Sequence, residues 1–361
     1  MKKLEFRDLF LEQIKRHSAM EPQDVVKLCY QAAFGAEHLL QDEEAAYRYL
    51  EQEYDAVEAD SEPLYEWIHP DVCRVNLAAW KREQLPLKWL FRMFAMSADN
   101  QPEDGRRMFR ECVESVGTLI EEQEIERGTE RGTGLTGEKW HSFLSKYPVD
   151  QPAAVHHSEE YRRKERPAYR LVCGRFVRMF PILQAIAKLS SEVKVVAIDG
   201  RCASGKTTLA GQLKQVTGAG LVHMDDFFLP PELRTEERLE EAGGNVHHER
   251  FMAEVLPHIA APQSFRYRRF DCSRMELGNE REVPTGTLRI VEGVYSCHPA
   301  LGQYMDLKVF CSVEHEEQLR RIKERDGCEM LEHFRNQWIP MEERYFQHFK
   351  IQENAEIVLM I

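Results

Sequence analysis

The chain has 361 residues, more than one hydrophobic core usually organises, so we expect two domains. Hydrophobic residues make up 43% of the chain and charged residues 30%, a balance that argues against a wholly disordered, collagen-like or membrane-embedded protein. The 48 basic and 61 acidic residues give a formal net charge of −13. Such a charge disfavours binding to nucleic acid or to anionic lipid, so we expect neither as a partner.

No apolar run approaches the roughly 18 residues that a membrane-spanning helix needs. The first eight residues, MKKLEFRD, mix acids with bases, so we expect no secretory signal or transit peptide and a cytoplasmic location. The nine cysteines are scattered without a CxxC pair. This pattern favours reduced thiols over disulfides or a zinc site.

Residues 1–190 are expected to form an all-α domain. Apolar residues recur at helical spacing around Leu9 and Ile14 and again after Pro22, which suits a first helical turn. Similar patterns continue over residues 43–57, 76–96 and 104–125. The glycine-rich segment 127–137 predicts a loop, because glycine stabilises regular elements poorly.

A basic segment follows at residues 156–170, HHSEEYRRKERPAYR. Arginine with tyrosine and histidine is typical of sites that recognise phosphate or carboxylate. The segment therefore predicts either an anion site, with His38, Arg74 and Asn76 as candidate companions, or a patch that docks on acidic surface of the same chain. Adjacent histidines on a helix cannot both face one ion, so His156 and His157 do not predict a metal site.

The pattern changes in residues 191–361, which we expect to form a second domain. Short, β-branched apolar runs predict strands at 193–198, 220–224, 288–291, 307–310 and 357–361. Helical patterns lie between them, at 206–216, 248–260 and 314–325. Buried strands that alternate with helices indicate an α/β fold whose parallel sheet is covered by helices on both faces.

Residues 200–207, GRCASGKT, satisfy the pattern GxxxxGK[ST] between an expected strand and an expected helix. In such a loop the backbone N–H groups and the start of the helix hold a polyphosphate, while the lysine reaches its β/γ phosphates and the hydroxyl ligates Mg²⁺. We therefore predict a nucleotide–Mg²⁺ site built from Gly200, Ala203, Ser204, Gly205, Lys206, Thr207 and Thr208.

Four motifs in order resemble the uridine kinase-like P-loop small-molecule kinases: the loop at 200–208, Asp225-Asp226-Phe227-Phe228, Ile290-Val291-Glu292-Gly293 and the arginine-rich helix 318–325. This group includes nicotinamide riboside kinase, pantothenate kinase and phosphoribulokinase, and the resemblance covers about residues 193–361. It implies a P-loop NTPase fold, with ATP and Mg²⁺ as cofactors. The implied reaction is transfer of the γ-phosphoryl group to a hydroxyl of a small metabolite, with a nucleoside as the expected acceptor.

The resemblance also implies residue roles. Asp225 matches the base that takes the proton of the acceptor hydroxyl, and Glu292 matches the acid that joins Thr207 in holding the metal. Arg321 and Arg325 match lid arginines that neutralise the transferring phosphoryl group. Further substrate candidates are Asp226, His247, Tyr267, Asp271 and Arg274. The two aspartates could instead cap a helix.

The sequence departs from the family pattern at a position expected to bind the phosphoryl acceptor. Where the family often has an aspartate that grips ribose hydroxyls, this chain has His247, and a neutral imidazole cannot accept from two hydroxyls at once. The chain therefore leaves two further hypotheses open, a regulatory protein in which ATP binding controls the helical domain and an enzyme whose helical domain performs its own chemistry. A small alcohol is the expected partner, and the oligomeric state stays open, a homo-oligomer included.

Overall fold

The computed structural model describes residues 5–36, 42–59, 61–98, 104–122, 135–271 and 274–361. His38 and most of the glycine-rich segment 127–137 lie outside the described residues. The chain divides into two compact units, Met1–Val177 and Arg178–Ile361. The expected boundary near residue 190 differs from this division by one helix, α10 (Phe180–Lys188), which belongs to the second unit.

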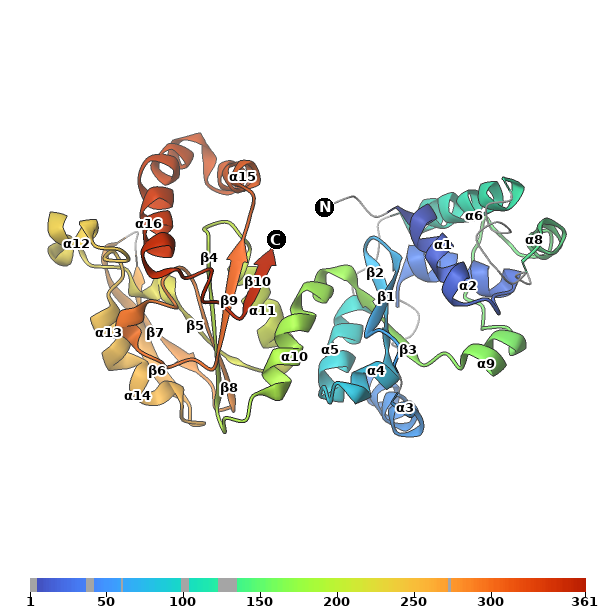
Figure 1. Cartoon of the computed structure of the whole chain (residues 1–361), viewed down its shortest axis with the longest axis horizontal. Helices are drawn as coiled ribbons and strands as arrows, with labels where there is room; N and C mark the ends of the chain where they lie inside the picture. Colours follow the sequence, from blue (N-terminus) through green and yellow to red (C-terminus); the bar gives the residue numbers. More distant parts are fainter. Residues whose placement is uncertain (1–4, 37–41, 60, 99–103, 123–134, 272–273) are drawn as a thin grey trace. The chain divides into compact units, whose positions relative to one another are not determined.

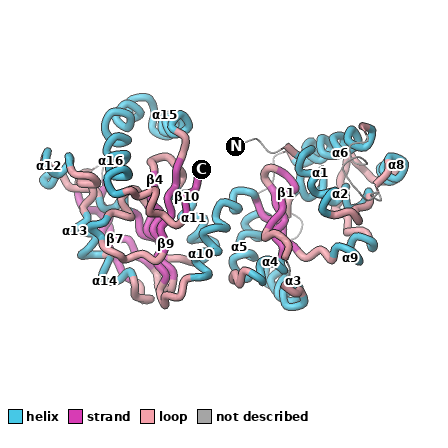
Figure 2. The backbone as a smooth tube through the Cα atoms, viewed as in Figure 1, coloured by secondary structure: helices cyan, strands magenta, loops and turns pink. Residues whose placement is uncertain are grey.

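The first unit contains an antiparallel sheet, so the prediction of an all-α domain is wrong. Three strands, labelled in Figure 1 and coloured magenta in Figure 2, pair in the order β1-β2-β3: β1 (Tyr65–His69), β2 (Val72–Asn76) and β3 (Tyr169–Cys173). Charged residues such as Glu66 and Arg74 interrupt the apolar pattern of these strands. Arg74 is nevertheless only 1% exposed, and it lies 3.6 Å from the Glu66 carboxylate, so the two charges compensate each other inside the unit.

The other described elements of the first unit are helical. α2 begins at Pro22, with a reciprocal capping box between Glu21 and Asp24. The single helix expected over 76–96 is two helices, separated by Gln84 at φ 55° and by Pro86, which cannot continue a helix. The helices are α1 (Phe6–Arg16), α2 (Pro22–Phe34), α3 (Glu43–Ala56), α4 (Leu77–Arg82), α5 (Leu87–Ala98), α6 (Gly105–Glu121), α8 (Gly137–Leu144) and α9 (Glu159–Glu165).

The second unit has the parallel sheet that the apolar runs predicted. Its described strands pair in the order β10-β9-β4-β8-β5, and each neighbouring pair is parallel. The bounds are β4 (Lys194–Gly200), β5 (Gly220–His223), β8 (Leu288–Glu292), β9 (Leu307–Ser312) and β10 (Ile357–Met360). The prediction of an α/β fold is therefore confirmed for this unit.

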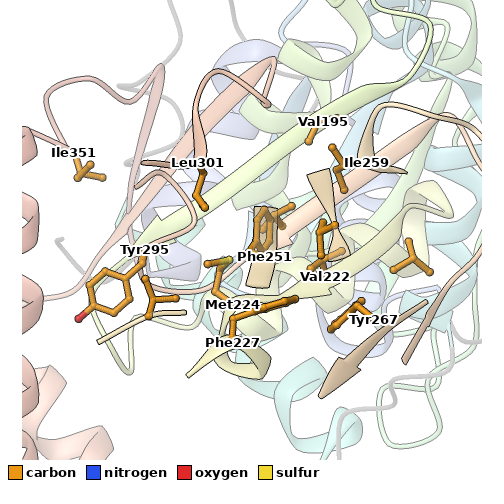
Figure 3. Close-up of a cluster of buried hydrophobic side chains, with 14 of the residues drawn as sticks. Val195, Val222, Met224, Phe227, Phe251, Ile259, Tyr267, Tyr295, Leu301 and Ile351 are labelled. Carbon is orange, nitrogen blue, oxygen red and sulfur yellow. The ribbon is translucent and has the colours of Figure 1, made fainter. Parts of the chain in front are cut away.

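Helices lie on both faces of this sheet (Figure 1). α11 (Lys206–Thr217) packs against β4, β5 and β8, and α10 packs against β9. On the other face, strand residues such as Val195 and Val222 join a buried cluster with Phe251 of α13 (His248–Glu254) (Figure 3). The rings of Phe227 and Tyr267 stack in the same cluster with centroids 5.3 Å apart. This stacking anchors the segment that follows β5.

The remaining elements of the second unit include an antiparallel hairpin and several helices. The helix expected over 248–260 is two, α13 (His248–Glu254) and α14 (Leu256–Ile259), and the antiparallel hairpin is β6 (Phe265–Asp271) with β7 (Glu276–Val283). α12 (Glu236–Glu240), α15 (His315–His333) and α16 (Ile339–Phe349) complete the unit. α15 is interrupted at Gly327, whose φ of 84° and ψ of 176° only glycine adopts readily. In the described part of the chain, no helix has the length and apolar character needed to cross a membrane.

Candidate functional site

The carboxyl ends of the parallel strands gather the predicted site. β4 ends at Gly200, β5 at His223, β8 at Glu292 and β9 at Ser312. His223 and Glu292 are direct partners in the pairing of β5 with β8. Ligands of open parallel sheets bind at this edge, and the phosphate loop follows β4 here.

The phosphate loop is shaped by backbone conformations that bend it into a cradle. Ala203 and Gly205 have φ of 56° and 86°, and α11 starts directly after the loop at Lys206. A turn of this kind directs successive N–H groups toward its concave side, where the positive end of the helix dipole adds to them. The loop therefore has the shape and polarity of an anion site.

Gly200 is the position where this loop tolerates no side chain. Its φ is 132°, and a Cβ added there would lie 2.0 Å from the carbonyl oxygen of Cys311 in the neighbouring strand. We expect Gly200→Ala to lower the free energy of unfolding by about 3 kcal/mol or more, because β4 or β9 must move.

Gly211 of α11 is the matched control, since a Cβ there meets nothing within 4 Å. Gly211→Ala is expected to raise stability by about 0.5–1 kcal/mol through helix propensity. Urea unfolding followed by circular dichroism measures both effects. Equal midpoints for Gly200→Ala and the unaltered protein would contradict the close approach of β4 to β9.

Lys206 and Ser204 place polar groups inside the loop. The Lys206 Nζ donates to the carbonyl oxygens of Gly200 and Arg201, each at 2.7 Å, and the residue is 7% exposed. The Ser204 Oγ is buried and has no hydrogen-bond partner among the described residues. A buried ammonium and an unused hydroxyl in one cradle suit a polyphosphate ligand.

Thr207 and Glu292 form the oxygen pair that the sequence assigned to Mg²⁺. The Thr207 Oγ1 lies 3.2 Å from the Glu292 Oε2, and Glu292 is 3% exposed. Within the described residues no three His, Cys, Asp or Glu side chains form a metal cluster. Magnesium in nucleotide sites is usually held by one or two protein oxygens together with phosphates and water, so this pair fits the ion.

His223 is a member of the site that sequence reasoning missed. Its Nδ1 lies 2.5 Å from the Glu292 Oε1, so Glu292 is held between the imidazole and the Thr207 hydroxyl. The available signal was its position as the last residue of β5, two residues before Asp225. We infer from this geometry that His223 positions the Glu292 carboxylate.

Asp225 and Asp226 differ sharply in their surroundings. Asp225 is exposed to solvent. Loss of hydration from the protein atoms around its carboxyl raises its pKa, and the negative charge of Glu292 raises it further, while Lys206 opposes the rise. Asp226 is 3% exposed, accepts a hydrogen bond from the Tyr267 hydroxyl at 2.9 Å and pairs with Arg281 at 2.8 Å. The Asp226 carboxylate thus already has partners within the protein, whereas the Asp225 carboxylate is exposed to solvent.

Neither aspartate caps a helix through its side chain. The two residues lie in a short 3₁₀ turn, Met224–Phe227, which has no side-chain cap. A second guanidinium, that of Arg269, lies 3.6 Å from the Asp226 carboxylate. Arg269 and Arg281 were not singled out in the sequence, because only the hairpin β6–β7 brings them to Asp226.

The arginines of α15 divide between the loop and solvent. The Arg321 Nη1 donates to the carbonyl oxygen of Ala203 at 3.2 Å. The pKa of Arg325 is raised mainly by its hydrogen bond to Asp326 and in smaller part by the charge of Asp225. Arg320 points away and pairs with Glu317 and Glu324. The side of α15 that carries Arg321 therefore faces the phosphate loop.

Three other residues predicted to bind substrate form hydrogen bonds or ion pairs with residues close to them in the sequence. His247 is the N-cap of α13, where its Nδ1 accepts from the backbone N–H of Arg250 at 3.3 Å. The backbone N–H of Arg274 lies 3.4 Å from the Asp271 Oδ1, and its guanidinium pairs with Glu276 at 2.7 Å. His247 has a capping role, and Asp271 and Arg274 build the hairpin turn.

Two buried side chains, one on α15 and one on α16, form hydrogen bonds to the phosphate loop. The sequence analysis did not predict either of them. Gln318 of α15 donates to the carbonyl oxygen of Cys202 at 3.1 Å, and Glu342 of α16 accepts from the Cys202 backbone N–H at 2.9 Å. Burial raises the pKa of Glu342 to about 7 from its usual 4.5, although Lys206 opposes the rise. The loop is therefore coupled to a group that titrates near neutral pH.

Glu342→Gln tests this coupling through the pH dependence of stability. The folded protein keeps Glu342 protonated to a higher pH than the unfolded chain does, so folding carries no charge penalty below about pH 4.5 and the full penalty above about pH 7. Glutamine keeps an acceptor for the Cys202 N–H but carries no charge. The advantage of the variant in free energy of unfolding should grow between those pH values, toward about 3 kcal/mol. Urea unfolding of both proteins at about pH 5 and about pH 8 measures it, and a difference that does not change with pH would contradict the prediction.

Comparisons with known proteins find similar solved structures only at low identity. No family model and no curated protein matches the chain. A possible uridine kinase from Bacillus stearothermophilus is 21% identical with a TM-score of 0.40, and the match covers 50% of this chain and 97% of that one. A protein from Silicibacter sp. TM1040, provisionally named a fructose transport system kinase, is 20% identical with a TM-score of 0.36 and coverages of 49% and 95%. Because both TM-scores are below 0.5, the α/β P-loop fold is assigned from the sheet order and phosphate loop of this chain itself.

Proposed function

We propose that the second unit is a kinase that uses ATP and Mg²⁺ to phosphorylate a hydroxyl of a small, nucleoside-like metabolite. The observation that carries the proposal is the gathering of Lys206, Thr207, Glu292 and Asp225 at one sheet edge. There, the Thr207 Oγ1 and the Glu292 Oε2 lie 3.2 Å apart. The charge of Glu292 raises the pKa of Asp225 and the charge of Lys206 lowers it. Phosphoryl transfer to an alcohol needs this combination of a phosphate cradle, metal ligands and a carboxylate base.

Each residue has a distinct part in this reaction. The loop N–H groups and Lys206 bind the phosphates, and Thr207 and Glu292 hold Mg²⁺, which neutralises phosphate charge when bound. Asp225 accepts the proton of the acceptor hydroxyl, and its raised pKa brings it nearer the range in which a carboxylate is an effective base. Arg321 and Arg325 have the role of stabilising charge on the transferring group in this proposal.

The acceptor side is expected around the hairpin. Tyr267 bridges two parts of the site, because its hydroxyl accepts from the His223 backbone N–H at 3.2 Å and donates to Asp226 at 2.9 Å. The nucleoside class is proposed from the order of the sequence motifs. His247 cannot supply the carboxylate usual for a ribose diol, so the acceptor panel includes alcohols without a ribose.

A thermal-shift panel tests the proposal. The full chain is heated with Mg²⁺ and a non-hydrolysable ATP analogue, alone and with nucleosides, vitamins and sugars. Saturating nucleotide is expected to raise Tm by several degrees only when Mg²⁺ is present, and a bound acceptor raises it further. A Tm that neither nucleotide nor any panel member shifts would refute the proposed function.

A further inference from the structure

The first unit contains a cavity that the proposed kinase function does not use. Its volume is about 720 Å³, within the range of small-molecule sites, and all of its lining residues belong to the first unit. The lining comes from the end of α1, the strands β1 and β2, α9 and the residues that follow α9. Lys164, Arg166 and Tyr169 of the basic segment 156–170 are among them, together with Arg74 and Asn76. The structure thus brings the predicted companions Arg74 and Asn76 to this segment.

The floor of the cavity is a rigid hydrogen-bond network. The guanidinium of Arg74 lies over the Tyr169 ring at 4.6 Å and donates to the Gln31 Oε1 at 2.7 Å. The Tyr169 hydroxyl is 2.8 Å from the His157 Nε2, and the His157 Nδ1 is 2.9 Å from the Asp24 Oδ1. Burial lowers the pKa of His157 to about 4. A neutral imidazole at ordinary pH donates to Asp24 and accepts from Tyr169, so the floor is ordered before any ligand arrives.

Two partly buried acids of the cavity, Glu66 and Glu165, are already neutralised. The ring nitrogens of His17 lie 3.0 Å from Glu66 and 3.1 Å from Glu165, and Arg74 adds a second cation 3.6 Å from Glu66. Burial alone would lower the pKa of His17, but the hydrogen bond and charge of Glu66 outweigh it and raise that pKa. These carboxylates therefore do not attract a cationic ligand strongly.

Three residues of the lining offer hydrogen-bond donors, and the exposed Glu58 carboxylate lies on the same lining. Tyr161 is 1% exposed and lines the cavity, and its hydrogen bond within the described residues is made by its backbone N–H to the Ser158 Oγ rather than by its hydroxyl. Burial holds the pKa of Tyr161 well above its usual value, so the hydroxyl keeps its proton. The Asn76 Oδ1 is taken by the Ala79 N–H at 3.1 Å, which leaves the Asn76 amide N–H groups. Arg166 is fixed in a left-handed conformation at the end of α9 and has no ion pair within the described chain.

We infer that this cavity is a second ligand site, which binds a small metabolite through an oxyanion, a carboxylate or a phosphate monoester. The oxyanion accepts hydrogen bonds from the Tyr161 hydroxyl, the Asn76 amide and the Arg166 guanidinium. The Tyr161 hydroxyl has no protein partner, so an acceptor on a ligand gives it a hydrogen bond that the folded chain does not supply. Charge-assisted hydrogen bonds from arginine supply the larger part of the affinity. The inference does not depend on the kinase function, because no residue of the second unit takes part.

Isothermal titration of the full chain with succinate and with inorganic phosphate tests the inference. The protein carries Lys206→Met, so that the phosphate loop contributes little to phosphate binding. At least one probe is expected to bind, and the probe that binds better tells a carboxylate site from a phosphate site. Arg166→Ala should weaken the better probe by about tenfold or more, and Tyr161→Phe by about three- to tenfold, because each removes one donor to the anion.

Arg163→Ala is the matched control. Arg163 lies on the same helix, is 69% exposed in its side chain and pairs with Glu160 without lining the cavity, so its loss should leave the affinity unchanged. Tyr161→Phe should keep the thermal midpoint of its parent, because the missing hydroxyl has no protein partner. The inference is overturned if neither probe binds. It is also overturned if Arg166→Ala and Tyr161→Phe bind as tightly as their parent, or if Arg163→Ala weakens binding as much as Arg166→Ala.

Discussion

Replacing Lys206 with methionine is expected to lower the rate of phosphoryl transfer by about 10³-fold, because the ammonium inside the phosphate cradle is lost. In the structure the ammonium is satisfied by the carbonyl oxygens of Gly200 and Arg201, each at 2.7 Å, and it is free to turn to a phosphate without leaving the loop. Methionine keeps the length and most of the volume of the side chain. The fold should therefore persist while nucleotide affinity and rate fall together.

The control for this variant lies on the same helix. Lys214 is exposed in the last turn of α11, and Lys214→Met removes the same charge from the protein without touching the loop. Consumption of Mg-ATP with the acceptor found by thermal shift measures both rates. If the two variants were equally active, Lys206 would have no part in the transfer.

Asp225→Asn is expected to lower kcat by about 10²–10⁴-fold with little change in nucleotide affinity, because asparagine cannot take the acceptor proton. The neighbouring Asp226→Asn should behave differently. Asp226 is buried between the Tyr267 hydroxyl at 2.9 Å and Arg281 at 2.8 Å, so its loss leaves an uncompensated arginine and lowers the free energy of unfolding.

The pair of variants separates a base from a structural carboxylate. Steady-state kinetics gives kcat and KM for each variant, and urea unfolding gives the free energy. A loss of kcat in Asp226→Asn with unaltered stability, together with full activity of Asp225→Asn, would reverse the assignment made from their surroundings.

The second unit was predictable from sequence because its signals are local. Each parallel strand is a continuous apolar run, and the loop GRCASGKT is one contiguous motif whose chemistry requires its residue types. The positions of Lys206, Thr207 and Glu292 then follow from where their strands end. Asp225 could be told from Asp226 only in the structure, because Tyr267 and Arg281 come to Asp226 from a hairpin more than 40 residues away in the chain.

The parts that sequence could not give depend on contacts between distant residues. β1 carries a partly buried charge, Glu66, and β2 a buried one, Arg74. These charges are tolerated because Glu66, Arg74 and His17 compensate one another in the folded unit. His223, Gln318 and Glu342 contact the site through single side chains at unremarkable positions in the chain. No spacing rule identifies such residues before the elements are packed.

Phosphorus NMR of the full chain with Mg-ATP and a mixed panel of nucleosides, vitamins and sugars tests the kinase assignment most directly. The account predicts a new phosphate monoester signal that grows in step with ADP and disappears in Asp225→Asn. ATP that stays intact, or that yields only ADP and inorganic phosphate with every member of the panel, would contradict it and would favour a nucleotide-gated regulatory protein instead.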